Sequence, residues 1–197
     1  MTRARPYHWI ILAFSAVIAL MSYRFLALGL DVAFENIPEH LSERRNWFGL
    51  HIGAAPVALL LGAVQFLPNQ RRKHPQVHVW IGRVYFVAIV LAGIAGLVLS
   101  FGAAERPAAA LGFGLLSVLW IGFTLVAVRH ALRRELAAHR RWMTRSFALT
   151  FAAVTLRVEI PLLMLLGFES YALMSPVLAW SCWVPNLLVA EWWLRRG

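Results

Sequence analysis

The chain has 197 residues, 60% of them hydrophobic, and its mean hydropathy is +0.67. This composition excludes an ordinary soluble protein, and the length suits a single integral-membrane domain over residues 1–197. The formal net charge of +10 does not indicate a nucleic-acid partner, because the basic residues fall in separate short segments and form no unbroken surface. We therefore expect the lipid bilayer to be the main partner.

Six apolar stretches are each long enough to cross a bilayer, which requires about 20 residues per helix. We place these spans at residues 8–30, 47–67, 78–101, 108–128, 142–167 and 173–193. The connecting loops are short, which is typical of antiparallel neighbours in a helix bundle. The sequence thus predicts an all-α polytopic membrane protein, a bundle of six transmembrane helices.

The basic residues in the termini and loops are distributed very unevenly between the two sides of the membrane. Twelve fall on one side: Arg3, Arg5, Arg71, Arg72, Lys73, Arg129, Arg133, Arg134, Arg140, Arg141, Arg195 and Arg196. The other side has only Arg44, Arg45 and Arg106. Because positive residues favour the cytoplasmic side, both termini should be cytoplasmic. We expect a multi-pass protein of the bacterial inner membrane.

The longest loop runs from Asp31 to Asn46 and should lie on the external side. We expect it to be solvated, with a short interfacial helix after Pro38. The alternative is a metal site formed by carboxylates and one histidine. Its candidate ligands are Glu35, Glu39, His40 and Glu43.

One face of the second span carries small side chains with a polar group near each end. His51, Ala55, Ala58, Gly62 and Gln65 repeat at helical spacing. This stripe either seats a neighbouring helix, with His51 bonded to a backbone carbonyl across the contact, or forms a groove for a ligand. Two further glycine pairs, Gly49 with Gly53 and Gly93 with Gly96, predict close approach between helices.

Polar residues inside the spans fall into two layers. The inner layer contains Gln65, His78, Arg83, Tyr85, His139 and Arg145, and the outer layer contains Arg24, His51, Arg157 and Glu159. A charged side chain at mid-span costs roughly 2.5–3.5 kcal/mol on insertion scales, so Arg24, Arg157 and Glu159 should face the bundle interior or a wet cavity. Glu159 is only two residues from Arg157 and points away from it, and Arg24 is its expected partner.

Three segments with these polar residues show a family resemblance. They are HIGAAPVALLLGAVQF from His51, HVWIGRVYF from His78 and HRRWMTRSFAL from His139. In this order and spacing the chain resembles the bacterial membrane proteins catalogued as domain of unknown function 2306. The resemblance implies a multi-spanning helical protein and no established reaction. The residues it marks as family features are His51, Gln65, His78, Gly82, Arg83, Tyr85, His139, Trp142, Arg145 and Arg157.

Three kinds of function fit these residues. The first is a non-catalytic membrane component, such as an assembly factor, sensor or partner subunit, whose polar layers specify packing. The second is a haem b-binding electron-transfer protein, with His78 and His139 as candidate iron ligands. The third is a transporter of protons or a small anionic solute. The sequence leaves open whether the protein is an enzyme, and we expect a homo-oligomer or a membrane partner subunit as further partners.

Overall fold

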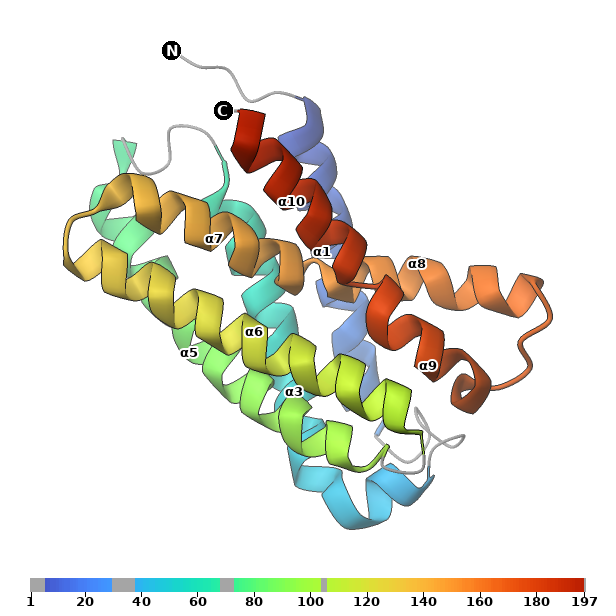
Figure 1. The fold of residues 1–197 in the computed structure, drawn as a ribbon. Helices are drawn as coiled ribbons and strands as arrows, with labels where there is room; N and C mark the ends of the chain where they lie inside the picture. The colour runs from blue at the N-terminus through green and yellow to red at the C-terminus, as the bar shows by residue number, and fades with distance from the viewer. Residues whose placement is uncertain (1–5, 30–37, 68–72, 104–105, 197) are drawn as a thin grey trace.

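The computed structural model describes residues 6–29, 38–67, 73–103 and 106–196, and in the segment 38–43 it describes the backbone alone. Within these ranges all regular structure is helical (Figure 1). The helices are α1 (Pro6–Leu28), α3 (Pro38–Gln65), α5 (Pro75–Phe101), α6 (Pro107–Leu132), α7 (Leu136–Thr150), α8 (Ala152–Leu165), α9 (Tyr171–Ser181) and α10 (Val184–Arg196).

These helices form six stretches long and apolar enough to cross a membrane, which confirms the predicted all-α fold of six spans. The stretches are Pro6–Leu28, Arg44–Gln65, Pro75–Phe101, Pro107–Leu132, Leu136–Leu165 and Tyr171–Arg196. Several begin at a proline, which is favoured in the first helical turn because the amide hydrogen it lacks would have no helical acceptor there. The start of α1 and the end of α10 lie at the same end of the molecule (Figure 1), as six crossings require.

The fifth and sixth spans are each built from two helices, a division that hydropathy did not predict. Near the first junction the Val154 amide donates to the carbonyl of Phe151, three residues back, at 2.9 Å. The side-chain amide of Asn186 donates to the carbonyl of Ala148 at 3.4 Å. A polar side chain from the sixth span therefore supplies a hydrogen bond at the point where the fifth span changes helix.

The second helix begins at Pro38, in agreement with the helix expected there. It has a non-helical residue at Arg44, with φ −129° and ψ 24°, so a short first segment precedes the membrane-spanning part. The side chains of the alternative metal site, Glu35, Glu39, His40 and Glu43, lie outside the described residues. That prediction stays untested.

The helices pack mainly as sequential antiparallel neighbours. α3 contacts α1 and α5, α6 contacts α5, α7 and α9, and α7 contacts α10. The main core cluster lies between these layers and includes Tyr85, Ile89, Trp120, Leu149 and Trp183. α8 is more peripheral and contacts α1 and α9.

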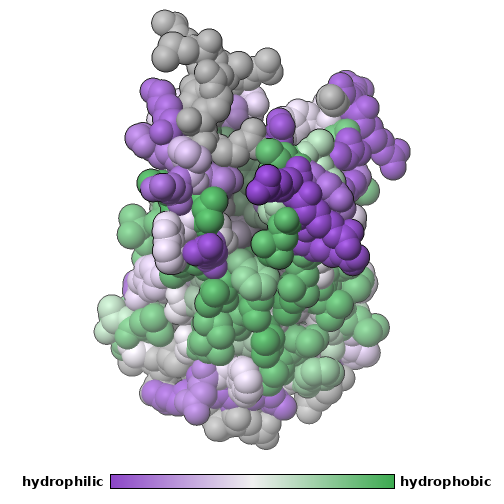
Figure 2. Space-filling view, turned by 90° about the vertical axis from the view of Figure 1, so that its left-hand side faces the viewer, coloured by the Kyte–Doolittle hydropathy of each residue, from purple (hydrophilic) through white to green (hydrophobic). Residues whose placement is uncertain are grey.

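The outer surface is strongly apolar, as expected where lipid is the solvent. Leu20 is 69% exposed, Leu111 67% and Leu165 85%, on three different helices. Figure 2 shows hydrophilic residues at both ends of one face and a hydrophobic band between them. The chain is a multi-pass membrane protein.

Candidate functional site

The most extensive polar cluster in the described structure is a buried network of hydroxyl groups around Tyr85. The phenol oxygen of Tyr85 on α5 lies 3.1 Å from Ser146 Oγ and 3.0 Å from Thr150 Oγ1, both on α7. From α6, the Trp120 indole donates to Thr150 Oγ1 at 2.8 Å, and Thr124 Oγ1 lies 2.8 Å from Ser146 Oγ. The network joins three helices and gives each hydroxyl a partner, so it fixes their mutual packing.

Two of these hydroxyls also bond to backbone oxygens of their own helices. Thr124 Oγ1 donates to the carbonyl of Trp120 at 2.7 Å, and Thr150 Oγ1 can donate to the carbonyl of Ser146 at 3.0 Å. With these protons directed to carbonyls, Ser146 can donate to Thr124 and Tyr85 can donate to Ser146. The network is therefore closed within the protein and needs no outside partner.

Gly62 of α3 provides the space in which the Tyr85 ring lies. A Cβ added to Gly62 would lie 2.8 Å from Tyr85 Cε2 and 2.7 Å from Phe147 Cδ2. Real Cβ atoms do not approach other atoms so closely, so this position needs a residue without a side chain. The predicted stripe of small residues in the second span thus seats an aromatic ring from α5 and another from α7.

Gln65 and His78 of the inner layer meet at the junction of α3 and α5. The Gln65 amide Nε2 donates to the backbone carbonyl of His78 at 2.8 Å. Gly82, one turn further along α5, leaves room for this amide, because a Cβ there would lie 3.2 Å from Gln65 Nε2. The contact ties the end of one span to the start of the next.

Two histidines make equivalent contacts with neighbouring helices. His51 Nδ1 lies 2.9 Å from the carbonyl oxygen of Ala92, and His139 Nδ1 lies 2.9 Å from that of Ala127. Because a carbonyl only accepts, Nδ1 is the donor in both cases. The alternative in which His51 bonds a carbonyl across a helix contact agrees with the structure, and His139 joins α7 to α6 in the same way.

Arg145 forms an ion pair that the sequence did not suggest. Its Nε donates to Oε1 of Glu191 on α10, and its Nη2 donates to Oε2 of the same carboxylate at 3.0 Å. The guanidinium also lies 4.7 Å from the centre of the Trp142 ring. This bidentate pair fastens α7 to α10. Arg83, by contrast, is exposed and lies over the Trp80 ring at 4.9 Å.

In the outer layer, Arg157 and Glu159 of α8 bond to different neighbouring helices. Arg157 Nη2 donates to Ser22 Oγ on α1 at 3.0 Å, and its Nη1 donates to the carbonyl of Ala153 at 3.0 Å. Glu159 Oε2 accepts a hydrogen bond from Ser181 Oγ on α9 at 2.8 Å. Serine hydroxyls therefore partner both charges.

Arg24 and Glu159, which both belong to the described residues, do not form the ion pair that the sequence predicted. Arg24 is exposed, and its guanidinium lies 4.9 Å from the ring centre of Phe25. Arg24 is one turn from the end of α1 at Leu28, so its long side chain can extend toward the membrane surface. The expectation that Arg24 faces the bundle interior was wrong for this reason.

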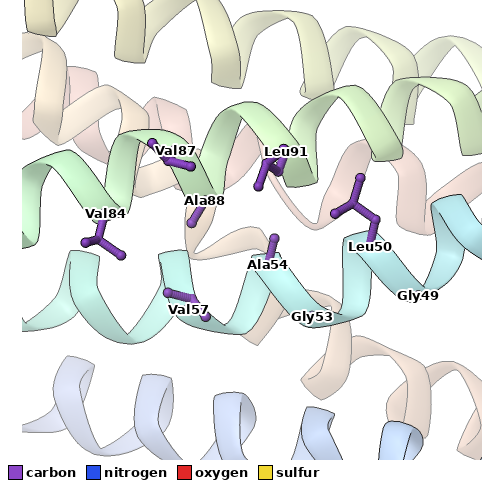
Figure 3. Close-up of a pocket in the computed structure, with 9 residues that line it drawn as sticks. All are labelled: Gly49, Leu50, Gly53, Ala54, Val57, Val84, Val87, Ala88 and Leu91. Atoms are coloured by element: carbon purple, nitrogen blue, oxygen red, sulfur yellow. The ribbon is translucent and has the colours of Figure 1, made fainter.

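The polar layers do not line either of two surface hollows found in the described structure. The first hollow, about 390 Å³, lies between α3 and α5 and is bordered only by apolar residues and glycines (Figure 3). Gly49 and Gly53 belong to this hollow, and a Cβ at Gly53 would have nothing within 4 Å. The close approach predicted at Gly53 was therefore wrong, whereas a Cβ at Gly93 would lie 2.6 Å from Ile121, as close packing requires.

Sequence reasoning missed most of the partners in these contacts. They are Ser22, Trp120, Thr124, Ser146, Thr150, Ser181, Asn186 and Glu191. Serine and threonine carry little hydropathy signal in an apolar span, so they do not stand out. The spacing of Ser146 and Thr150, four residues apart on one helix face, was the available signal.

The comparison with known families agrees with these observations. A family model described as a predicted membrane protein, domain of unknown function 2306, matches residues 48–194. The match covers the helices that carry the Tyr85 network, both histidine contacts and the Arg145–Glu191 pair. No curated protein and no solved structure matches the chain. The chain therefore belongs to the membrane protein family catalogued as domain of unknown function 2306.

Proposed function

We propose that the protein is a non-catalytic membrane component whose intramembrane polar residues hold the bundle in one arrangement. The observation that carries this proposal is that the polar side chains bond to neighbouring helices of the same chain. The contacts are His51 with Ala92, His139 with Ala127, Arg145 with Glu191, Arg157 with Ser22, and Glu159 with Ser181. Each one joins two different helices.

A physical reason favours this role for polar groups in a bilayer. Lipid tails are as apolar as leucine, so apolar side chains gain little when one helix packs against another within the membrane. Hydrogen bonds and close packing then select which helices meet. Polar groups bonded in this way stabilise one arrangement of the helices. A bundle with a single stable arrangement suits a partner subunit, an assembly factor or a sensor.

Exchanging the charges of Arg145 and Glu191 tests the proposal. Either single reversal, Arg145→Glu or Glu191→Arg, places two like charges together and should lower the melting temperature of the protein in mild detergent. The double variant restores an ion pair and should recover most of the loss. Arg83→Glu is the matched control, because Arg83 is exposed and its reversal should change the melting temperature little.

Two measurements would instead favour the alternative functions. A Soret band in protein from haem-replete cells, lost in both His78→Ala and His139→Ala, would identify a haem b protein. Solute or proton flux in proteoliposomes that Arg157→Gln abolishes without unfolding the chain would identify a transporter. A colourless protein without flux, together with recovery of the melting temperature in the double variant of Arg145 and Glu191, supports the role of a non-catalytic membrane component.

A further inference from the structure

We propose that the arginine-rich end of α10 binds one anionic phospholipid, with its phosphate on the arginines and an acyl chain in the adjoining apolar hollow. The residues involved are Leu188, Val189, Trp192, Arg195 and Arg196. Counted from Leu188 they are offset by 0, 1, 4, 7 and 8 positions, which places them on one face of the helix. One surface thus changes from apolar to cationic along its length.

The apolar part of this face is open to lipid. Leu188 is 64% exposed, Val189 65% and Trp192 55%, and together they line a shallow surface hollow. From Leu188 to Arg196 the helix rises about 12 Å. That distance is suited to a lipid whose phosphate contacts Arg196 while the upper part of one chain lies against Leu188 and Val189.

The cationic part has more than one arginine. The guanidinium of Arg196 lies 4.0 Å from the centre of the ring of Trp192, one of the residues that line the hollow. Arg141 of α7 donates to the carbonyl of Leu194 at 3.2 Å, which brings a third arginine to the same helix end. Guanidinium groups bind phosphate oxygens through paired hydrogen bonds, so this cluster has the chemistry to hold a lipid phosphate.

The charge of this end is not cancelled within α10. Glu191 is the one acidic residue in α10, and both of its carboxylate oxygens already bond to Arg145. Arg195 and Arg196 are exposed. A second copy of the chain presenting the same face would bring arginines against arginines, whereas an anionic phospholipid offers both the negative charge and the apolar chain that the face lacks.

Native mass spectrometry of the purified full chain tests the site, with dioleoyl phosphatidylglycerol as the anionic probe and dioleoyl phosphatidylcholine for comparison. Phosphatidylglycerol should bind more tightly to the unaltered chain. Each interfacial arginine is worth about fivefold in affinity for an anionic lipid. The double variant R195Q/R196Q should therefore lose most of this preference, with an unchanged melting temperature showing that it still folds.

The matched control is R129Q/R133Q, which removes the same charge from two exposed arginines at the end of α6. It should leave the preference for phosphatidylglycerol unchanged, and an equal loss in the control would overturn the site in favour of general attraction. Dihexanoyl phosphatidylglycerol should bind more weakly than the long-chain lipid. Equal binding of dihexanoyl and dioleoyl phosphatidylglycerol would also overturn the proposed site. So would displacement of the lipid by inorganic phosphate, or a dimer that R195Q/R196Q dissociates.

Discussion

Tyr85 and Ser146 are separated by 61 positions in the chain, yet their hydroxyl oxygens lie 3.1 Å apart in the buried centre of the bundle. Tyr85 is 1% exposed and Ser146 is fully buried, so neither group can bond to water or lipid headgroups. A polar group without a partner at this depth would cost several kcal/mol. The pair therefore specifies how α5 packs against α7, and removing one hydroxyl should be measurable.

Tyr85→Phe should destabilise the protein by about 1 kcal/mol, because the ring still packs against Gly62 while the hydroxyl bonds are lost. The measurement is reversible unfolding in mixed detergent micelles with increasing sodium dodecyl sulfate. Tyr23→Phe is the control: its hydroxyl donates to the carbonyl of Gly53 at 3.2 Å in an exposed position and should matter less. Equal stability of Tyr85→Phe and the unaltered chain would contradict a specifying role for the network.

Gly62→Ala should destabilise by about 1–3 kcal/mol, because the new methyl group overlaps the rings of Tyr85 and Phe147. Gly53→Ala, on the same helix, is the control and should be neutral or stabilising by roughly 0.4–1 kcal/mol, because nothing lies within 4 Å of the added carbon. Thermal unfolding of both variants in one detergent decides the comparison. Similar melting temperatures for the two variants would show that α3 does not approach α5 and α7 as closely as described.

Ser22→Ala should destabilise the protein by about 1.5–3 kcal/mol, because it removes the hydroxyl that accepts a hydrogen bond from the Arg157 guanidinium and leaves this charged donor without that acceptor. Ser15→Ala on the same helix should be neutral or stabilising, because the Ser15 hydroxyl is buried and makes no hydrogen bond within the described residues. The two variants differ by seven positions and remove the same atom. Resistance to unfolding in detergent is the readout, and a larger loss in Ser15→Ala would contradict the assignment.

Asn186→Ala should destabilise by about 1–3 kcal/mol, because this side chain bonds to Thr155 Oγ1 at 2.9 Å and to the carbonyls of Cys182 and Ala148. Hydrogen exchange should also quicken around the junction of α7 and α8, since the Ala148 carbonyl loses its side-chain donor. Asn46→Ala, at an exposed position, provides the control. Unchanged exchange at the junction would show that Asn186 does not hold it.

The sequence by itself determined the number of spans and the family, because both depend on local information. A span needs only enough consecutive apolar residues, and the segments from His51, His78 and His139 carry the family pattern in order. The sequence also placed Tyr85, Gln65 and Arg145 in the inner polar layer, and it predicted that Arg157 and Glu159 face the bundle interior or a wet cavity. The cost of burying a charge in hydrocarbon holds for any fold, which is why these positions could be singled out from the sequence alone.

Only the tertiary structure decided which groups those partners are. Arg145 bonds to Glu191 and Arg157 to Ser22, whereas the pairing of Arg24 with Glu159 was wrong because Arg24 lies near a helix end and turns outward. Hydropathy does not encode the rotation of one helix against another, and serine and threonine look nearly neutral in an apolar span. The choice among partners depends on distances between residues far apart in the chain, and packing alone sets those distances.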